Sequence, residues 1–170
     1  GQDSHILNFQ NPCMDEAELD RAKEIALEKD FDKKLTICFA GTLTKNKGVD
    51  ILLEALDTIK SKDDIREVIF AGDGNEKMRY EETAGKINMK ISFRGLLDRK
   101  SLEKVYEESH LIILPSESEG FPKVIAEAAA FGCVPVVSDI SSIGQYFNDT
   151  NGFLLKNINS DEISEVIGLA

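Results

Sequence analysis

Apolar residues gather in short runs along the chain, and amphipathic segments separate one run from the next. The runs that we expect to form strands cover residues 35–40, 68–71, 91–93, 111–114, 134–138 and 152–155. Most of these runs are nearly continuous in apolar residues, which is typical of strands that are buried on both faces. The pattern therefore predicts a sheet covered by other elements on each side.

Apolar positions recur at helical spacing between the strands. They predict helices over residues 15–29, 49–60, 76–87, 100–108 and 122–131, a short helix over 141–146 and a last one that starts near Ser160. This alternation predicts an α/β fold, namely a doubly wound parallel six-stranded sheet in a Rossmann-like three-layer sandwich with right-handed crossovers. Sheets of this kind bind ligands at the carboxyl ends of their strands.

Length and composition are those of one globular domain. The chain has 170 residues, of which 42% are hydrophobic and 30% are charged. Residues 1–14 lack periodicity and are expected to be a linker or a cloning scar, and residues 15–170 are expected to form the single domain. No apolar run approaches the roughly 20 residues that span a bilayer, and the N-terminus lacks the pattern of a signal peptide.

Charge and cysteine content narrow the possible partners. The formal net charge of −11 argues against nucleic acid as a partner and against direct insertion of this part into a membrane. Cys38 and Cys133 occupy core positions and are interpreted as small apolar fillers in a reducing compartment. With only two histidines and no paired cysteines, the sequence offers no metal-ligand spacing, and we expect no metal.

The segment 116–128 carries the most specific chemistry. Pro122 suits the first position of a helix, so the N–H groups of Lys123, Val124 and Ile125 would lack partners within that helix and would favour an anion. One carboxylate, Glu119, precedes this anion site, and a second, Glu127, follows inside the helix. The layout suits a ligand with a central diphosphate and hydroxyl groups at both ends, which is the chemistry of a nucleotide sugar.

This segment resembles the donor site of retaining glycosyltransferases of the family 4 type, which have two facing Rossmann-like domains (GT-B type). The other landmarks of their C-terminal domains follow in order at 39–43 with Lys47-Gly48, at 69–74, at 91–95 and at 127–137. Each motif is weak alone, and their order makes the resemblance specific from residue 35 to residue 155. The fold, the activity and the residue roles of the family thereby become expectations for this chain.

The resemblance implies a role for each matching residue. Glu119 would be the catalytic residue, which faces the donor sugar and stabilises charge at its anomeric carbon. The residues expected to bind the donor sugar and the diphosphate are Gly41, Thr42, Lys47, Gly120, Phe121, Lys123 and Val124. Glu127 would hold the ribose, and Arg94, Gly95 and Leu96 would form the turn that receives the base.

Thr42 departs from the family pattern. Many relatives place an arginine here, which forms a pair of cations with the lysine that matches Lys47. A threonine hydroxyl can donate one hydrogen bond but supplies no charge. Lys45 is a candidate for compensation, and the departure puts the affinity for diphosphate in question.

The resemblance also implies partners and context. The substrate would be a nucleoside-diphosphate sugar, used without a cofactor or metal, and the acceptor would be a saccharide or glycolipid. The chain would be the C-terminal half of a longer enzyme, cut in its last helix and inactive without the N-terminal domain. The location would be cytoplasmic, or peripheral to the inner membrane face through that other domain.

Other functions remain as alternatives. An inactive glycosyltransferase-like binding or scaffold domain is favoured only by Thr42. A nucleotide-sugar epimerase of the same architecture fits the Glu-Gly-Phe-Pro context poorly, and a receiver domain would need clustered acids after the first strand. Serine hydrolase chemistry lacks both the nucleophile elbow and a His/Asp pair.

Overall fold

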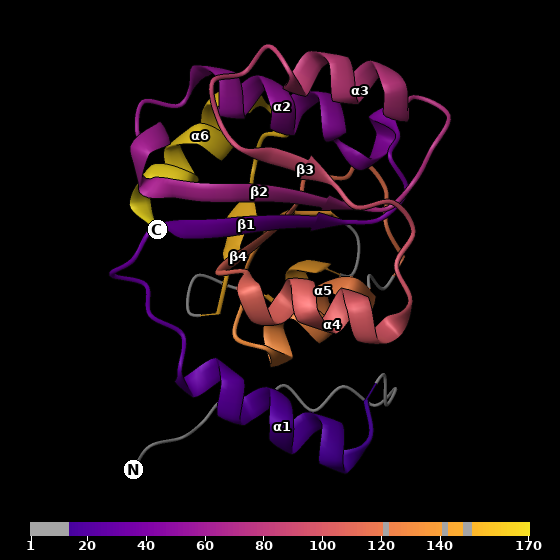
Figure 1. Cartoon of the computed structure of the whole chain (residues 1–170), viewed down its shortest axis with the longest axis vertical. Coiled ribbons are helices and arrows are strands. Elements are labelled where there is room, and N and C mark those ends of the chain that lie inside the picture. The colour runs from indigo at the N-terminus through magenta and orange to yellow at the C-terminus, as the bar shows by residue number, and fades with distance from the viewer. Residues whose placement is uncertain (1–13, 121–122, 141–142, 148–150) are drawn as a thin grey trace.

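Parallel strands form the centre of the structure, a computed structural model that describes residues 14–120, 123–140, 143–147 and 151–170 (Figure 1). The strands are β1 (Leu35–Ala40), β2 (Ile65–Ala71), β3 (Ile91–Phe93), β4 (Leu111–Leu114), β5 (Val134–Ser138) and β6 (Phe153–Leu155). They form one six-stranded sheet in the order β3-β2-β1-β4-β5-β6, and every neighbouring pair is parallel. The expected sheet is confirmed, and the strand order reverses between β1 and β4.

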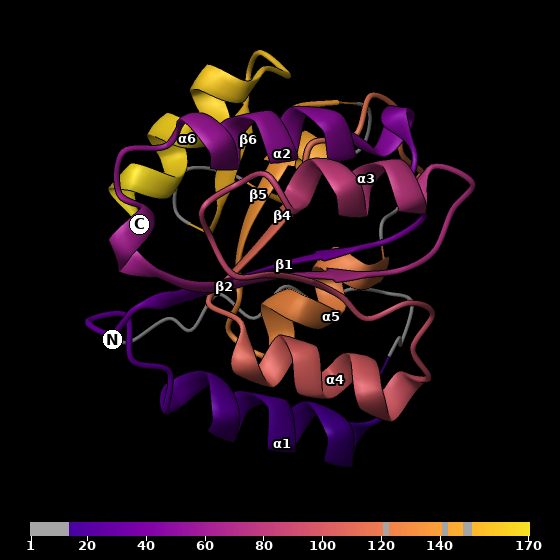
Figure 2. The ribbon, with the colours of Figure 1, turned by 45° about the horizontal axis from the view of Figure 1, so that its top comes forward.

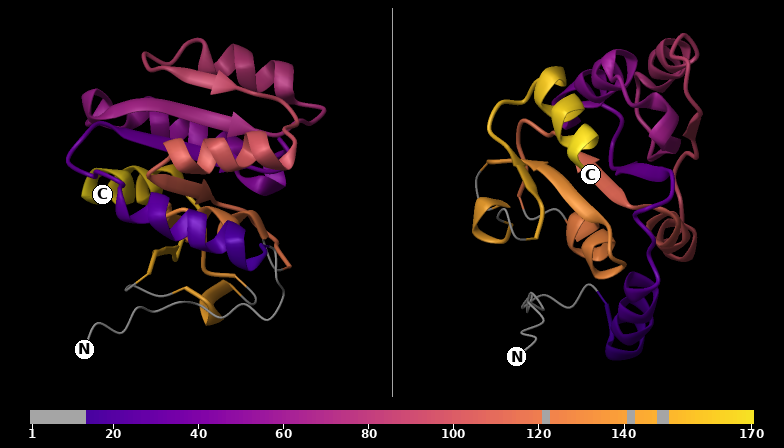
Figure 3. Two further views of the ribbon diagram at one scale, coloured as in Figure 1. Left: turned by 60° about the horizontal axis from the view of Figure 1, so that its bottom comes forward. Right: turned by 90° about the vertical axis from the view of Figure 1, so that its left-hand side faces the viewer.

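Helices cover both faces of this sheet. The α-helices are α1 (Glu16–Leu27), α2 (Val49–Thr58), α3 (Lys77–Ala84), α4 (Arg99–Glu108), α5 (Lys123–Ala130) and α6 (Ser160–Leu169). Figure 2 shows α2, α3 and α6 on one side of the strands and α4 and α5 on the other, with α1 lying outside α4. The views in Figure 3 show the same layers from two other sides. The sheet is therefore doubly wound.

The central strands are buried along their whole length. Every residue of β1 and of β4 is buried, because the two helical layers remove both faces of these strands from water. Their continuous apolar runs follow from this position. The burial of apolar surface on both faces is the main driving force that holds the layers together.

Strand β2 begins earlier than its apolar run predicts, at Ile65 instead of residue 68. Polar residues at its start are satisfied by neighbouring strands. Arg66 Nε donates to Thr36 Oγ1 at 2.9 Å, and the Glu67 carboxylate accepts from Ser92 Oγ at 2.8 Å. Because these side chains have partners, the strand extends into a stretch that hydropathy alone excludes.

Helix α1 begins with a reciprocal capping box. Asp15 Oδ1 accepts from the Glu18 amide, and Glu18 Oε2 accepts from the Asp15 amide, each at 2.8 Å. Ion pairs then fix the helix to α4, since Arg99 contacts Glu18 at 2.7 Å and Arg21 contacts Glu103 at 3.3 Å. These contacts place α1 against the layer that contains α4 and α5.

Some expected segments lie wholly or partly outside the described residues. Of the expected linker over 1–14, only Met14 is described, and Phe121 also falls outside. The short helix expected over 141–146 is a 3-10 helix at Ile143–Gln145, and residues 141–142 are outside the described part. Within the described residues, no helix combines the length and the apolar character needed to cross a bilayer.

Candidate functional site

A cleft of about 210 Å³ opens at the carboxyl ends of β1 and β4, beside the switch point. It is lined by Ala40, Gly41, Thr42, Lys47, Leu114, Glu119, Lys123 and Val124. The cleft thus gathers most of the residues expected to bind donor sugar and diphosphate, although they come from three separate segments of the chain.

A larger cavity of about 280 Å³ lies among residues that begin β1 and β2 and end α6, including Leu35, Ile65 and Gly168. This cavity is at the amino-terminal edge of the sheet. We assign the functional site to the smaller cleft because it combines a glycine loop, two lysines and the start of a helix at the ligand-binding edge of the fold.

The loop that follows β1 places Lys47 in the cleft. The Gly41 amide donates to the Ala71 carbonyl at 3.0 Å and continues the pairing of β1 with β2. Lys47 then ends a 3-10 helix, η1 (Lys45–Lys47), and Gly48 follows at φ 79°. A Cβ at Gly48 would lie 2.2 Å from the Pro115 carbonyl oxygen, so only glycine permits this approach between the two loops.

Hydrogen bonds join the loop after β1 to the loop after β4. The Glu117 amide donates to the Asn46 carbonyl at 2.9 Å. The buried Ser116 hydroxyl is 3.2 Å from the same carbonyl and 3.0 Å from the Ser118 carbonyl. Ser116 therefore fixes the spacing between Lys47 and Glu119. Because serine is common in polar loops, the sequence alone gives no signal for this role of Ser116.

Lys47 and Glu119 form an ion pair inside the cleft, in which Lys47 Nζ donates to Glu119 Oε1. The Glu119 side chain is only 11% exposed and that of Lys47 is 29% exposed. Solvent therefore screens this pair less than a surface pair. Glu117, two residues before Glu119, is exposed.

Lys123 supplies a second cation at the cleft. It is the first residue of α5, where the amide N–H groups of the first turn point out of the helix. Thr42 also lines the cleft and is exposed, whereas Lys45 is exposed and is not among the lining residues. Lys123, unlike Lys45, therefore brings a second positive charge to the cleft.

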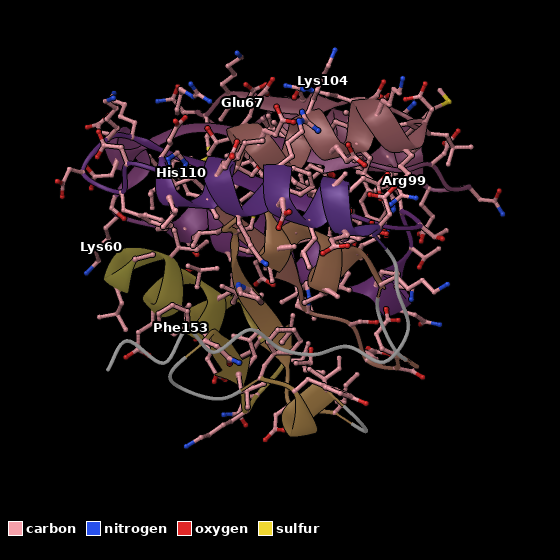
Figure 4. The ribbon with its side chains drawn as sticks, turned by 90° about the horizontal axis from the view of Figure 1, so that it is seen from below. Lys60, Glu67, Arg99, Lys104, His110 and Phe153 are labelled. Atoms are coloured by element: carbon pink, nitrogen blue, oxygen red, sulfur yellow. The ribbon has the colours of Figure 1, made fainter. Side chains whose placement is uncertain are left out.

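Glu127 lies four residues after Lys123 in α5, so both side chains lie on one face of the helix. Glu127 is half-buried and faces α4, where it shares a small cavity with Arg99 and Glu103. Burial raises the pKa of its carboxyl, and the Arg99 charge opposes this rise. In Figure 4, Arg99 lies at the opposite end of the molecule from Lys60 and His110.

The turn expected to receive the base is fixed by its backbone. The Gly72 amide donates to the Gly95 carbonyl at 2.8 Å, and Gly95 has φ 68°. Leu96 projects outward and is 81% exposed. The Arg94 guanidinium instead contacts the exposed Glu108 at 3.4 Å and the buried Glu67 at 3.8 Å, so its charge is directed to these two acids.

The remaining expected residues add little to the geometry. Gly120 is exposed just before the described part of the chain is interrupted, and Phe121 lies outside it. Within the described residues, no group of three or more His, Cys, Asp or Glu side chains is arranged to hold a metal ion. The chemistry on view is therefore that of two cations, one paired carboxylate and the amides that begin α5.

This combination of a doubly wound parallel sheet and a cationic cleft at the carboxyl ends of its strands matches the Rossmann-like fold of GT-B glycosyltransferases. The chain belongs to the family of glycosyl transferases group 1, whose pattern matches residues 20–170. The expected family is thereby confirmed, and this chain is a domain of about 170 residues from such a protein.

Individual relatives agree with this assignment. An uncharacterised glycosyltransferase of Methanocaldococcus jannaschii is 28% identical over 165 residues, which cover 94% of this chain and 42% of the relative. This chain therefore spans less than half the length of that relative.

Solved structures share the fold. The catalytic domain of cholesterol-α-glucosyltransferase from Helicobacter pylori superposes with a TM-score of 0.72 at 23% identity, covering 81% of this chain and 86% of that one. Anabaena HepE, solved in complex with UDP and glucose, has a TM-score of 0.70 at 19% identity and covers 92% of this chain and 43% of that one.

Proposed function

We propose that this chain is the donor-binding domain of a retaining glycosyltransferase that uses a nucleoside-diphosphate sugar. The observation that carries the proposal is the meeting of Lys47, Lys123 and the start of α5 around one cleft, with Glu119 inside it. Two cations and the amides of the first turn of α5 match a diphosphate. The complex of HepE with UDP and glucose supports the same class of ligand.

The donor would lie along one direction of the site. The diphosphate takes the position between Lys47 and Lys123, close to Gly41, Thr42 and the amide of Val124. Glu127 follows on the same face of α5 and accepts hydrogen bonds from the ribose hydroxyls. The exposed Leu96 and the backbone of 94–95 pack against the base, while Glu119, with 120–121, faces the sugar.

Binding of a donor changes the partner of Lys47. In the structure its ammonium group donates to Glu119. A diphosphate carries more charge than one carboxylate and draws the ammonium toward itself. Glu119 is then released toward the sugar, where its negative charge stabilises positive charge at the anomeric carbon.

The transfer step needs mainly electrostatic help. The bond between the anomeric carbon and the diphosphate oxygen breaks, and the diphosphate leaves with the electron pair. Lys47, Lys123 and the α5 amides stabilise that leaving group without a metal ion. The oxygen of an acceptor hydroxyl on a saccharide or lipid-linked molecule then bonds to the same face of the sugar, which retains its configuration, and the hydroxyl proton passes to the leaving diphosphate.

The acceptor would come from outside this chain. We place its site on an N-terminal domain that faces the cleft, so the isolated chain binds donor but does not transfer sugar. The buried free thiols of Cys38 and Cys133 favour a reducing, cytoplasmic location. Contact with the inner membrane face would be made through the other domain.

An inactive binding domain is the second candidate, and Thr42 in the cleft favours it because the usual cation is missing there. Both candidates predict nucleotide binding if Lys123 replaces that cation. Sugar transfer by a protein that contains this chain together with its N-terminal domain separates them. Transfer supports the enzyme, and tight binding without transfer or donor hydrolysis supports the binding domain.

Calorimetry with UDP, GDP, ADP and CMP tests the proposal on this chain. One nucleoside diphosphate should bind, and Glu127→Ala should weaken that binding. Glu54→Ala is the matched control, because Glu54 is an exposed helical glutamate on α2. No binding by any of the nucleotides, or equal effects of the two variants, would contradict the proposed donor site.

A further inference from the structure

Tyr106 has a buried hydroxyl group without a partner. The residue belongs to α4 and its side chain is fully buried, at 0% exposure. Its Oη atom makes no hydrogen bond within the described residues. A buried polar group without a hydrogen bond is costly, and such groups are rare in native proteins. The hydroxyl of Tyr106 therefore calls for a partner that the described residues do not supply.

A small cavity lies next to this tyrosine. Its volume is about 10 Å³, and Tyr106, Glu127, Arg99 and Glu103 supply its polar lining. A cavity of roughly 10–15 Å³ on this measure is the smallest that holds one water molecule, which also needs two to four polar partners. The cavity lies at the lower end of this range, and its lining includes Tyr106 and Glu127, whose side chains carry the polar groups that one water molecule could join.

The charges around the cavity suit a tyrosine that donates and a glutamate that accepts. Burial raises the pKa of the Tyr106 hydroxyl, and the charge of Glu127 raises it further, so Tyr106 keeps its proton at neutral pH. Arg99 and Glu103 already have charged partners, since they contact each other at 3.3 Å, Arg99 contacts Glu18 at 2.7 Å and Glu103 contacts Arg21 at 3.3 Å. Tyr106 Oη is therefore the buried donor beside this cavity for which the described residues offer no partner.

We propose that Tyr106 is a positioning residue for Glu127, and that its hydroxyl donates through one buried water molecule to the Glu127 carboxylate. The water accepts from Tyr106 Oη and donates to a carboxylate oxygen. This bridge restrains Glu127 from the side of α4 and leaves its other oxygen for a ligand. The inference rests on the proposed function in one respect, namely that the ligand presents ribose hydroxyls to Glu127.

The variant Tyr106→Phe removes the donor and keeps the aromatic ring. Loss of a hydrogen bond to the charged form raises the pKa of a carboxyl group, so we expect the Glu127 pKa to rise by about half a unit in this variant. Carboxyl carbon NMR of the labelled chain measures this value directly. An unchanged Glu127 pKa would overturn the proposal.

The affinity of the variant for two nucleotides is a second test, and it separates a positioning role of Tyr106 from a general loss of packing. Tyr106→Phe should weaken the binding of UDP by about fivefold. It should leave the binding of 2′,3′-dideoxy-UDP unchanged, because that analogue lacks the hydroxyl groups that Glu127 would accept from. Equal weakening of both nucleotides would contradict a positioning role.

Tyr80→Phe is the matched control. Tyr80 is also buried, but its hydroxyl donates to Asp50 at 2.9 Å and to Glu76 at 3.1 Å, in a cluster between α2 and α3. This variant should lower stability without changing the Glu127 pKa or the preference for UDP over its dideoxy analogue. If UDP fails to bind the wild-type chain, the proposed nucleotide site is wrong, and the NMR measurement still decides whether Tyr106 acts on Glu127.

Discussion

Replacing Glu119 by glutamine should strengthen the binding of a nucleoside diphosphate. In the cleft the Lys47 ammonium donates to the Glu119 carboxylate. A diphosphate that binds there must draw Lys47 away from this partner. Glu119→Gln keeps the size of the side chain and removes its charge, so the competing partner is weakened and more of the Lys47 charge is available to the ligand.

The burial of the pair sets the size of the effect. The two side chains are 11% and 29% exposed, which places the pair between an exposed pair, worth about 0.2–1 kcal/mol, and a fully buried one. We therefore take about 1 kcal/mol as the interaction that is lost. If all of it is returned on binding, the dissociation constant for UDP falls about fivefold.

Isothermal titration calorimetry with UDP measures this change at low, fixed ionic strength. Glu117→Gln is the control, because Glu117 is exposed two residues away and should leave the affinity unchanged. The competition between Glu119 and diphosphate would be refuted if two results came together. These are that Glu119→Gln binds UDP no more tightly than wild type, and that Lys47→Met binds UDP with the same affinity as wild type. The reasoning would also fail if both glutamine variants gained affinity equally.

Three further predictions follow from other parts of the site. Gly48→Ala should lower the free energy of unfolding by about 2–4 kcal/mol in urea titrations, because the residue has φ 79° and its Cβ would lie 2.2 Å from the Pro115 carbonyl oxygen. A loss of less than about 1 kcal/mol would mean that the loops after β1 and β4 can move apart at little cost. Burial raises the Glu127 pKa, so wild type should lose stability relative to Glu127→Gln as pH rises above about 4.3. Thermal denaturation should show no difference between the two proteins at lower pH. If Glu127→Gln were less stable than wild type at neutral pH, the predicted direction of the stability difference would be wrong. Ser116→Ala should lower the free energy of unfolding by about 1 kcal/mol and weaken UDP binding, because the Ser116 hydroxyl contacts the Asn46 carbonyl at 3.2 Å. An unchanged UDP affinity in calorimetry would argue that Ser116 does not set the spacing of the two loops.

Local sequence patterns predicted much of this architecture. The apolar run at 111–114 and the Pro-Lys-Val segment after Gly120 place a buried strand before a helix, and the structure has β4 and α5 there. Those features depend on neighbours along the chain, so a single sequence suffices. The gathering of Gly41, Lys47 and Glu119 at one edge also follows, because parallel strands bring their carboxyl ends together.

Contacts between distant segments could not be predicted in the same way. The ion pair of Lys47 with Glu119 and the hydrogen bond from Ser116 to the Asn46 carbonyl depend on how the loop after β1 packs against the loop after β4. The Arg94 guanidinium turns to Glu108, which no local pattern indicates. These details depend on side-chain packing in three dimensions, where many residues compete for the same space.

The central claim is that a nucleoside diphosphate sugar binds between Lys47 and the start of α5. Backbone amide NMR of the labelled chain, titrated with UDP-glucose and GDP-mannose, tests it most directly. The account predicts that one of the two ligands shifts the amides of 41–48 and 123–127 most strongly. Shifts centred instead on Leu35, Ile65 and Gly168, around the larger cavity at the opposite edge, or no shifts with either ligand, would contradict it.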